Sequence, residues 1–156
     1  LLSKKVNKVI CFEISEKGRN AIKDNWSRNG SIGEITVLSE ANEESIKELD
    51  KRDLNNSLVL IDIEGFEFDL LSSENLESFK NCNILLEVHD FAENFMEKYI
   101  ELLRRASLHF EIKIIDRKER PTFELEELRD FHDENRLILT SEQRPCVMRF
   151  LHLKPL

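Results

Sequence analysis

The sequence predicts an α/β fold in which a largely parallel sheet is covered by helices on both faces. Segments with strand character alternate with segments of helical spacing, an order typical of right-handed βαβ units. Two of the strand segments are nearly continuous runs of Leu, Val and Ile, as expected for strands buried on both sides. The 156 residues are 40% hydrophobic and 35% charged, with only four Gly and three Pro. We therefore expect residues 1–156 to form a single domain with a real core.

Six segments are expected to be strands. In chain order they are residues 8–13, 34–38, 57–63, 83–88, 108–114 and 147–153. Segments 57–63 and 83–88 are the continuous apolar runs, whereas 108–114 alternates strictly and 147–153 is mixed. Because half-buried strands show such patterns, we place the last two segments near a sheet edge.

Helices are expected between these strands. Ser15 is a suitable N-cap for the first helix, in which Ile22 and Trp26 lie one turn apart. Asn42 can cap a second helix whose opening residues, Glu43 and Glu44, suit the positive end of the helix dipole.

Two more helices are expected in the second half of the chain. A stripe of residues at helical spacing indicates core packing of one helix: Phe91, Phe95, Tyr99, Leu102 and Ala106. A short helix after Pro121 is indicated by Leu125, Leu128 and Phe131.

Charge and apolar runs exclude several classes of protein. Twenty-three Lys and Arg against thirty-one Asp and Glu leave a net charge of −8, so binding to nucleic acid or to an anionic membrane is not expected. The longest apolar runs are four residues, too short to span a bilayer. We expect a cytoplasmic protein. The sequence opens with Leu1-Leu2 and not with Met, so the fact that no signal peptide is visible indicates little about targeting.

The three cysteines, Cys11, Cys82 and Cys146, show no CxxC spacing, which favours small buried residues over a disulfide framework or a zinc site.

Polar residues follow the expected parallel strands. In open parallel sheets, ligands bind beyond the carboxyl ends of the strands. The candidates are Glu13, Ser39-Glu40, Asp62-Ile63-Glu64-Gly65 and Glu87-Val88-His89-Asp90. A carboxylate such as Glu13 can accept both hydroxyls of a ribose, although an acid here can also cap the helix that begins near Ser15.

The acids of the third and fourth strands suit chemistry at a hydroxyl. Asp62 and Glu64 are two residues apart, so they share one side of an extended strand, and so do Glu87 and His89. Gly65 permits a sharp turn into the next helix. Carboxylates beside an imidazole can deprotonate a hydroxyl or hold a divalent metal. The alternatives are helix-capping acids and a neutral His89 hydrogen-bonded at its strand end.

These residues carry a resemblance to a known family. Segment 59–71 resembles the Asp-x-Glu-Gly-x-Glu signature of FkbM-type S-adenosylmethionine-dependent methyltransferases, and 84–91 is similar to that family's strand ending in Glu-x-His. Segment 9–13 resembles the family's second strand, and 25–30 the end of the following helix. Segment 144–155 is similar to the C-terminal strand of one FkbM-like branch.

The resemblance implies a Rossmann-like class I methyltransferase sheet, mostly parallel with an antiparallel C-terminal strand. It further implies that Glu13 holds the ribose of S-adenosylmethionine and that Ser39, Glu40 and Ala41 lie near its adenine.

For the acceptor, the resemblance implies a hydroxyl of a small molecule or glycan. Asp62, Glu64 and His89 would orient or deprotonate this hydroxyl, with Glu87 supporting His89. We expect Glu13, Asp62 and His89 to converge on one rim of the sheet.

The sequence departs from the family at its beginning. Family members start with a strand and a glycine-bearing loop around the methionine part of the cofactor, whereas Leu1–Lys5 looks like the end of the helix after that loop. We therefore expect an N-terminally truncated part of a longer protein that lacks the first strand.

Two other functions fit the same residues. One is a hydrolase or transferase dependent on a divalent metal, and the other is a non-catalytic interaction module on a degenerate methyltransferase fold. A divalent metal and a homo-oligomer are compatible with the sequence.

Overall fold

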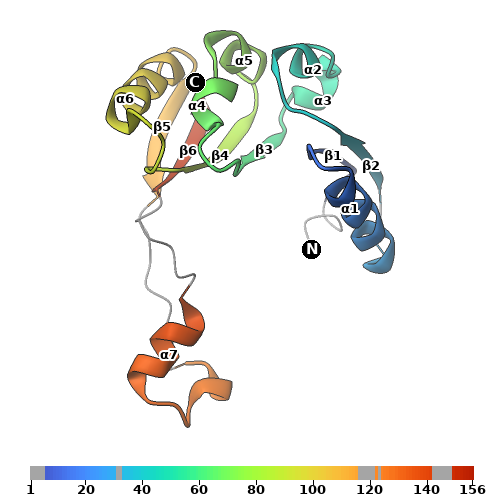
Figure 1. Ribbon diagram of the computed structural model, residues 1–156. Coiled ribbons are helices and arrows are strands. Elements are labelled where there is room, and N and C mark those ends of the chain that lie inside the picture. Colours follow the sequence, from blue (N-terminus) through green and yellow to red (C-terminus); the bar gives the residue numbers. More distant parts are fainter. Residues whose placement is uncertain (1–5, 31–32, 116–121, 123, 142–148) are drawn as a thin grey trace. The chain divides into compact units, whose positions relative to one another are not determined.

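The computed structural model describes residues 6–30, 33–115, 122, 124–141 and 149–156. The chain divides into two compact units, Leu1–Asp50 and Lys51–Leu156. The first unit has a two-stranded sheet, and the second has a four-stranded sheet (Figure 1). The expectation of a single domain over residues 1–156 stays a prediction.

The first unit is built around one βαβ element. Strands β1 (Lys8–Phe12) and β2 (Glu34–Leu38) pair in parallel, and α1 (Glu16–Arg28) connects them. The predicted N-cap is confirmed, because the Ser15 side chain accepts a hydrogen bond from the Gly18 backbone N–H at 3.0 Å. Local sequence signals therefore define where this helix begins.

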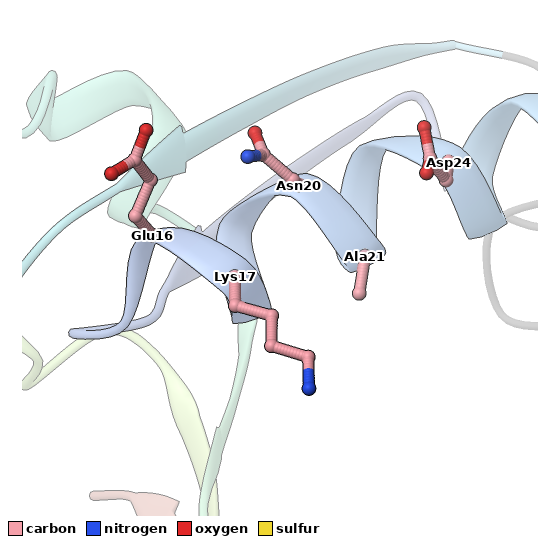
Figure 2. A pocket seen from close by; sticks show the side chains of 5 residues that line it. All are labelled: Glu16, Lys17, Asn20, Ala21 and Asp24. Carbon is pink, nitrogen blue, oxygen red and sulfur yellow. The ribbon is translucent and has the colours of Figure 1, made fainter.

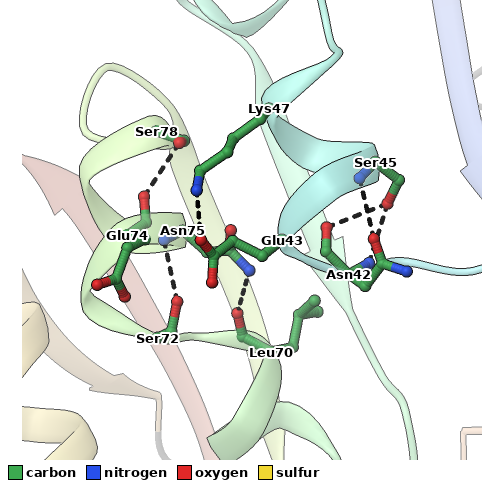
Figure 3. Close-up of polar contacts among 9 residues, drawn as sticks. All are labelled: Asn42, Glu43, Ser45, Lys47, Leu70, Ser72, Glu74, Asn75 and Ser78. Atoms are coloured by element: carbon green, nitrogen blue, oxygen red, sulfur yellow. Dashed lines mark hydrogen bonds and ion pairs between the residues drawn. The ribbon is translucent and has the colours of Figure 1, made fainter.

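A short helix, α2 (Glu43–Lys47), follows β2. Its N-cap is Asn42, as predicted, and Asn42 and Ser45 form a reciprocal capping box (Figure 3). Ile46 is only 1% exposed and anchors this helix.

The second unit contains the remaining elements. They are α3 (Lys51–Leu54), β3 (Leu58–Ile61), α4 (Glu67–Leu70), α5 (Ser73–Ser78), β4 (Asn83–Val88), α6 (Phe95–Ala106), β5 (Phe110–Ile115), the 3₁₀ helix η2 (Glu126–Leu128), α7 (Asp133–Thr140) and β6 (Arg149–Pro155). Two side-chain contacts define the start of α5: Ser72 accepts from the Asn75 backbone N–H, and the Asn75 amide donates to the Leu70 carbonyl (Figure 3). No helix of the described residues has both the length and the apolar character that a membrane span requires.

The four-stranded sheet has the order β3-β4-β6-β5. β3 and β4 pair in parallel, and β6 runs antiparallel to both β4 and β5. β5 therefore runs in the same direction as β3 and β4. The prediction of a mostly parallel α/β sheet with an antiparallel C-terminal strand is confirmed.

The core of this unit lies on one face of the sheet. Leu86 pairs with Leu151, and Ile84 pairs with Leu153, and all four side chains are fully buried. Helix α6 contacts α4, α5 and β5 and contributes the buried Leu102. Apolar burial on this face is the main favourable term that holds the strand ends in place.

Two expectations about the sheet can be compared with the strand order and burial. Segments 108–114 and 147–153 were expected near a sheet edge, and this is confirmed, because β5 is an edge strand and β6 lies next to it, between β4 and β5. The pattern of β6 is mixed because buried Leu151 and Leu153 alternate with more accessible residues. The expectation that β3 is covered on both faces is wrong within its own unit, since Leu58 and Leu60 are 55% and 56% exposed.

Two helical expectations also need correction. Phe91 does not belong to the α6 stripe: the helix begins only at Phe95, after Asn94 in the left-handed conformation (φ 56°), and Phe91 is 55% exposed. After Pro121, η2 is a single 3₁₀ turn, and α7 follows where no helix was expected.

The cysteines agree only in part with the expectation of burial. Cys82 is buried and its thiol donates to the Leu54 carbonyl at 2.7 Å, while Cys11 in β1 is half-buried. Both are free thiols. Cys146 lies outside the described residues.

Candidate functional site

A group of acids and one histidine lies where β3 and β4 end. The two strands are parallel and in register from Leu58 with Asn83 to Ile61 with Leu86, so the residues that follow them emerge at the same edge. Asp62, Glu87 and His89 each place one side-chain atom within 4.8 Å of the others. We call these three residues the Asp62–Glu87–His89 cluster.

His89 is held by a buried carboxylate that the sequence analysis did not assign to it. Glu67, at the start of α4, is 0% exposed, and its Oε1 accepts from the His89 backbone N–H at 2.7 Å. The His89 Nδ1 atom lies 3.3 Å from both oxygens of Glu67. Glu67 thus supports the ring, and Glu87 contributes an oxygen to the cluster; the expected support of His89 by Glu87 stays a prediction.

The other nitrogen of His89 faces two more carboxylates. Its Nε2 lies 3.5 Å from Asp62 Oδ1 and 3.6 Å from Glu64 Oε2. The His89 side chain is 0% exposed, whereas those of Asp62 and Glu64 are 59% and 79% exposed. The imidazole therefore forms the floor of the site, and the two carboxylates form its solvent side.

A tight turn between β3 and α4 places these carboxylates. Glu64 and Gly65 both have positive φ, 54° and 100°, and the Phe66 backbone N–H bonds to the Ile63 carbonyl across the turn at 3.3 Å. The Gly65 N–H donates to Glu67 Oε2 at 2.9 Å, which ties the turn to the carboxylate that holds His89. A left-handed Glu is unfavourable, and strain of this kind concentrates at functional sites.

A cation and an aromatic ring border the cluster. Phe91, which the helical stripe had assigned to the core, packs its ring against that of His89 with centroids 5.3 Å apart. Arg149 on β6 lies 3.5 Å from Asp90, and its guanidinium stands over the rings of Phe95 and Tyr99 at 5.2 and 6.0 Å. These cation–π contacts hold Arg149 beside β4, where it pairs with Val88.

The expected cofactor-binding residues come together in the first unit. Glu13 and Ser39 follow directly after β1 and β2, and the Glu13 backbone N–H donates to the Leu38 carbonyl at 3.1 Å. The parallel pairing therefore brings Glu13 and Ser39 to one edge, with Glu40 exposed and Ala41 half-buried next in the chain.

Glu13 also has a local structural role. Its Oε1 accepts from the Ser15 backbone N–H at 2.8 Å and from the Ser15 hydroxyl at 2.7 Å. These hydrogen bonds to the charged form lower the pKa of the Glu13 carboxyl from its ordinary value. The carboxylate folds back over Gly18, where a Cβ atom would lie 2.5 Å from Glu13 Cδ. The capping role and the binding role considered for Glu13 are thus compatible, because Ser15 bonds to only one of its oxygens.

The two groups belong to different units of the chain, the Glu13 group to the first and the Asp62–Glu87–His89 cluster to the second. Their expected convergence on one rim stays a prediction.

A surface hollow along α1 does not coincide with either group. Figure 2 shows its lining, which comes from one helix alone: Glu16, Lys17, Asn20, Ala21 and Asp24. It contains neither the histidine nor the strand-end acids discussed above, and we assign no chemistry to it.

Strand-end acids on parallel β-strands joined by helices define a Rossmann-like α/β protein. Solved structures support this class. The chain has a TM-score of 0.57 and 12% identity with a structure titled as a putative rRNA methylase from Clostridium thermocellum, covering 96% of this chain and 73% of that one. It has a TM-score of 0.51 and 13% identity with one titled as precorrin 8w decarboxylase from Methanobacterium thermoautotrophicum, covering 95% and 69%. At these identities the likeness concerns the fold.

The family is shown by a family model described as the methyltransferase FkbM domain, which matches residues 19–135. The chain therefore belongs to the FkbM methyltransferase family, as its motifs predicted. The matched region contains the Asp62–Glu87–His89 cluster and Ser39–Ala41, whereas Glu13 lies outside it. Among curated proteins, none matches this sequence.

Proposed function

We propose that this chain is an S-adenosylmethionine-dependent methyltransferase that methylates a hydroxyl oxygen of a small molecule or glycan. One observation carries the acceptor chemistry: a buried imidazole is fixed by Glu67 on one nitrogen and faces two exposed carboxylates with the other. Membership of the FkbM family supports the transfer of a methyl group.

The acceptor side is argued from His89. A hydrogen on Nδ1 can be donated to Glu67, which leaves a lone pair on Nε2. If the hydroxyl group of the methyl-acceptor substrate binds between Asp62 and Glu64, the lone pair of His89 Nε2 is next to it and can accept its proton. Nε2 takes the hydroxyl proton, while the two carboxylates orient the acceptor by accepting from its other hydroxyls.

The cofactor side is argued from the first unit. Glu13 would accept the ribose hydroxyls through the oxygen that Ser15 leaves available, and Ser39, Glu40 and Ala41 would lie beside the adenine. S-adenosylmethionine supplies an electrophilic methyl group when it is bound. Because such a transfer depends mainly on placing the acceptor oxygen in line, the role of the chain is to position the acceptor and remove one proton.

The net charge favours a small acceptor over a nucleic acid. One structural neighbour is titled as a putative rRNA methylase, but binding of RNA depends on neutralising phosphates with cations. With a net charge of −8 and an acidic rim at the site, we propose a small-molecule or glycan acceptor, with no nucleic-acid or membrane partner. We place the enzyme in the cytoplasm.

Calorimetry with S-adenosylhomocysteine tests this function. The protein should bind the ligand, and Glu13→Ala should weaken binding about tenfold or more, the cost of losing a charge-assisted hydrogen bond. Glu16→Ala removes an exposed carboxylate from the same helix start and is the matched control, with unchanged affinity. No binding to the protein, or equal loss in both variants, would contradict the proposal.

A further inference from the structure

Three electron-pair donors converge at the edge of β3 and β4. They are one carboxylate oxygen each from Asp62 and Glu87 and one ring nitrogen of His89, all within 4.8 Å of one another. Glu87 and His89 are 6% and 0% exposed. Two carboxylate oxygens and an imidazole nitrogen so close together form a donor set of the kind that binds a divalent cation.

The second observation concerns the nitrogen that faces this space. Among the described residues, His89 Nε2 has no hydrogen-bond partner although it is buried; the nearest carboxylate atoms, Asp62 Oδ1 and Glu64 Oε2, are beyond hydrogen-bonding distance at 3.5 and 3.6 Å. Buried polar atoms are normally satisfied, and each exception needs an explanation. A bound ion would supply the partner that Nε2 lacks.

His89 is held by a carboxylate in the way that metal-binding histidines usually are. A ligating imidazole usually donates its other N–H to a carboxylate, which fixes the ring and makes the ligating nitrogen more basic. Glu67 occupies that position, 3.3 Å from Nδ1 and itself fully buried. The His89 ring is therefore already oriented with Nε2 toward the acids.

The distances are close to those that one ion requires. Metal–nitrogen and metal–oxygen bonds of about 2.0–2.2 Å allow two ligands of one ion to be at most about 4.3 Å apart. The 3.5 Å between Asp62 and His89 meets this limit directly. The other two pairs of donor atoms lie within 4.8 Å, so a movement of about half an ångström at most brings all three within this limit.

We propose that Asp62, Glu87 and His89 bind a divalent transition-metal ion. One imidazole with two carboxylates favours Mn²⁺ or Zn²⁺ over Ca²⁺, because Ca²⁺ is bound almost entirely by oxygen. Glu64, which is not one of the three ligands, remains beside the ion on the solvent side.

The catalytic use of this ion rests on the proposed function, whereas its binding does not. An acceptor hydroxyl coordinated to the ion becomes more acidic. With Nε2 engaged as a ligand, the proton passes to Glu64, so the ion changes which residue accepts it.

Titration with MnCl₂, followed by the electron paramagnetic resonance signal of free Mn²⁺, tests the site without any assay of activity. The protein should bind about one Mn²⁺ per chain, and Zn²⁺ should displace it more readily than Ca²⁺ does. Asp62→Asn should abolish this binding; because Asp62 is exposed, the variant is expected to fold, which circular dichroism verifies. Glu67→Gln should weaken binding about 10–100-fold, the usual effect of removing the partner of a ligating histidine.

Two further variants complete the experiment. Glu64→Gln should retain Mn²⁺ binding, and so should Asp69→Asn, which removes an exposed carboxylate of α4 outside the cluster. Equal Mn²⁺ binding by the wild type and Asp62→Asn, or no binding by the wild type, would overturn the metal site. Methyl transfer without Mn²⁺ binding would refute the metal site alone, whereas Mn²⁺ binding without any S-adenosylhomocysteine binding would refute the proposed function alone.

Discussion

Removal of the Glu67 carboxylate is the sharpest test of how the site is built. Its two oxygens accept backbone hydrogen bonds from Gly65 at 2.9 Å and from His89 at 2.7 Å, and both oxygens lie 3.3 Å from His89 Nδ1. Hydrogen bonds to a charged acceptor contribute about 1.5–3 kcal/mol each. Glu67→Ala should therefore lower the free energy of unfolding by about 3–6 kcal/mol, a large part of the total of about 5–15 kcal/mol for a domain.

The milder variant Glu67→Gln keeps one of the two acceptors, because the amide oxygen accepts while the amide nitrogen does not. We expect it to cost about 1.5–3 kcal/mol. Urea unfolding followed by circular dichroism, with linear extrapolation to water, measures both variants. Glu93→Gln changes an exposed carboxylate in the loop after β4 and should stay within about 0.5 kcal/mol of the wild type.

A second measurement tests whether Glu67 orients the His89 imidazole, independently of its effect on the free energy of unfolding. In the wild type, ¹⁵N chemical shifts of His89 should report hydrogen on Nδ1, facing Glu67, and none on Nε2. Glu67→Gln should remove this preference. A cost below about 1 kcal/mol for Glu67→Ala, or hydrogen on Nε2 of the wild type, would refute the reasoning.

Two further predictions follow from local structure. Ser15→Ala should raise the pKa of the Glu13 carboxyl part of the way toward its ordinary value, because it removes the hydroxyl hydrogen bond, the largest cause of the lowered pKa, while the backbone N–H of residue 15 still donates; an NMR titration measures this, with Ser15→Thr as the control. Since the folded-state pKa is lowered, this contribution to stability is present above the ordinary carboxyl pKa and is lost as the pH falls through the folded value, and a Ser15→Ala profile identical to the wild type would contradict the assignment. Glu64→Gly should increase the free energy of unfolding by about 1 kcal/mol, because Glu64 has a φ of 54° and glycine adopts that conformation without a Cβ penalty; urea unfolding measures the change, and a destabilised variant would argue against strain at this turn.

The elements could be predicted because their signals are local. Ser15 and Asn42 cap the helices that they precede, and the apolar runs at 57–63 and 83–88 contain β3 and β4. Capping depends on the next three residues, and strand character depends on the residues of the strand itself. The family motifs are likewise short runs of sequence, which is why the acids and His89 could be singled out.

The errors occurred where local spacing resembles that of another element. Phe91 is four residues before Phe95 and fits a helical stripe, but the left-handed backbone at Asn94 delays the helix, and the Phe91 ring packs on His89. For the third strand, a continuous apolar run suggested cover on both faces, yet within its own unit Leu58 and Leu60 of β3 are 55% and 56% exposed. Which elements cover a strand is decided by the packing of distant segments and not by the pattern within that strand.

The sequence by itself determined the α/β class, the family and the identity of the residues at the strand ends, because each of these depends on neighbouring residues. Only the tertiary structure showed that the Glu67 carboxylate accepts a hydrogen bond from His89, 22 residues away along the chain. It also showed that Nε2 is buried against Asp62 without a hydrogen-bond partner among the described residues. Both features arise from the parallel register of β3 and β4, since that pairing brings the turn after one strand against the end of the other.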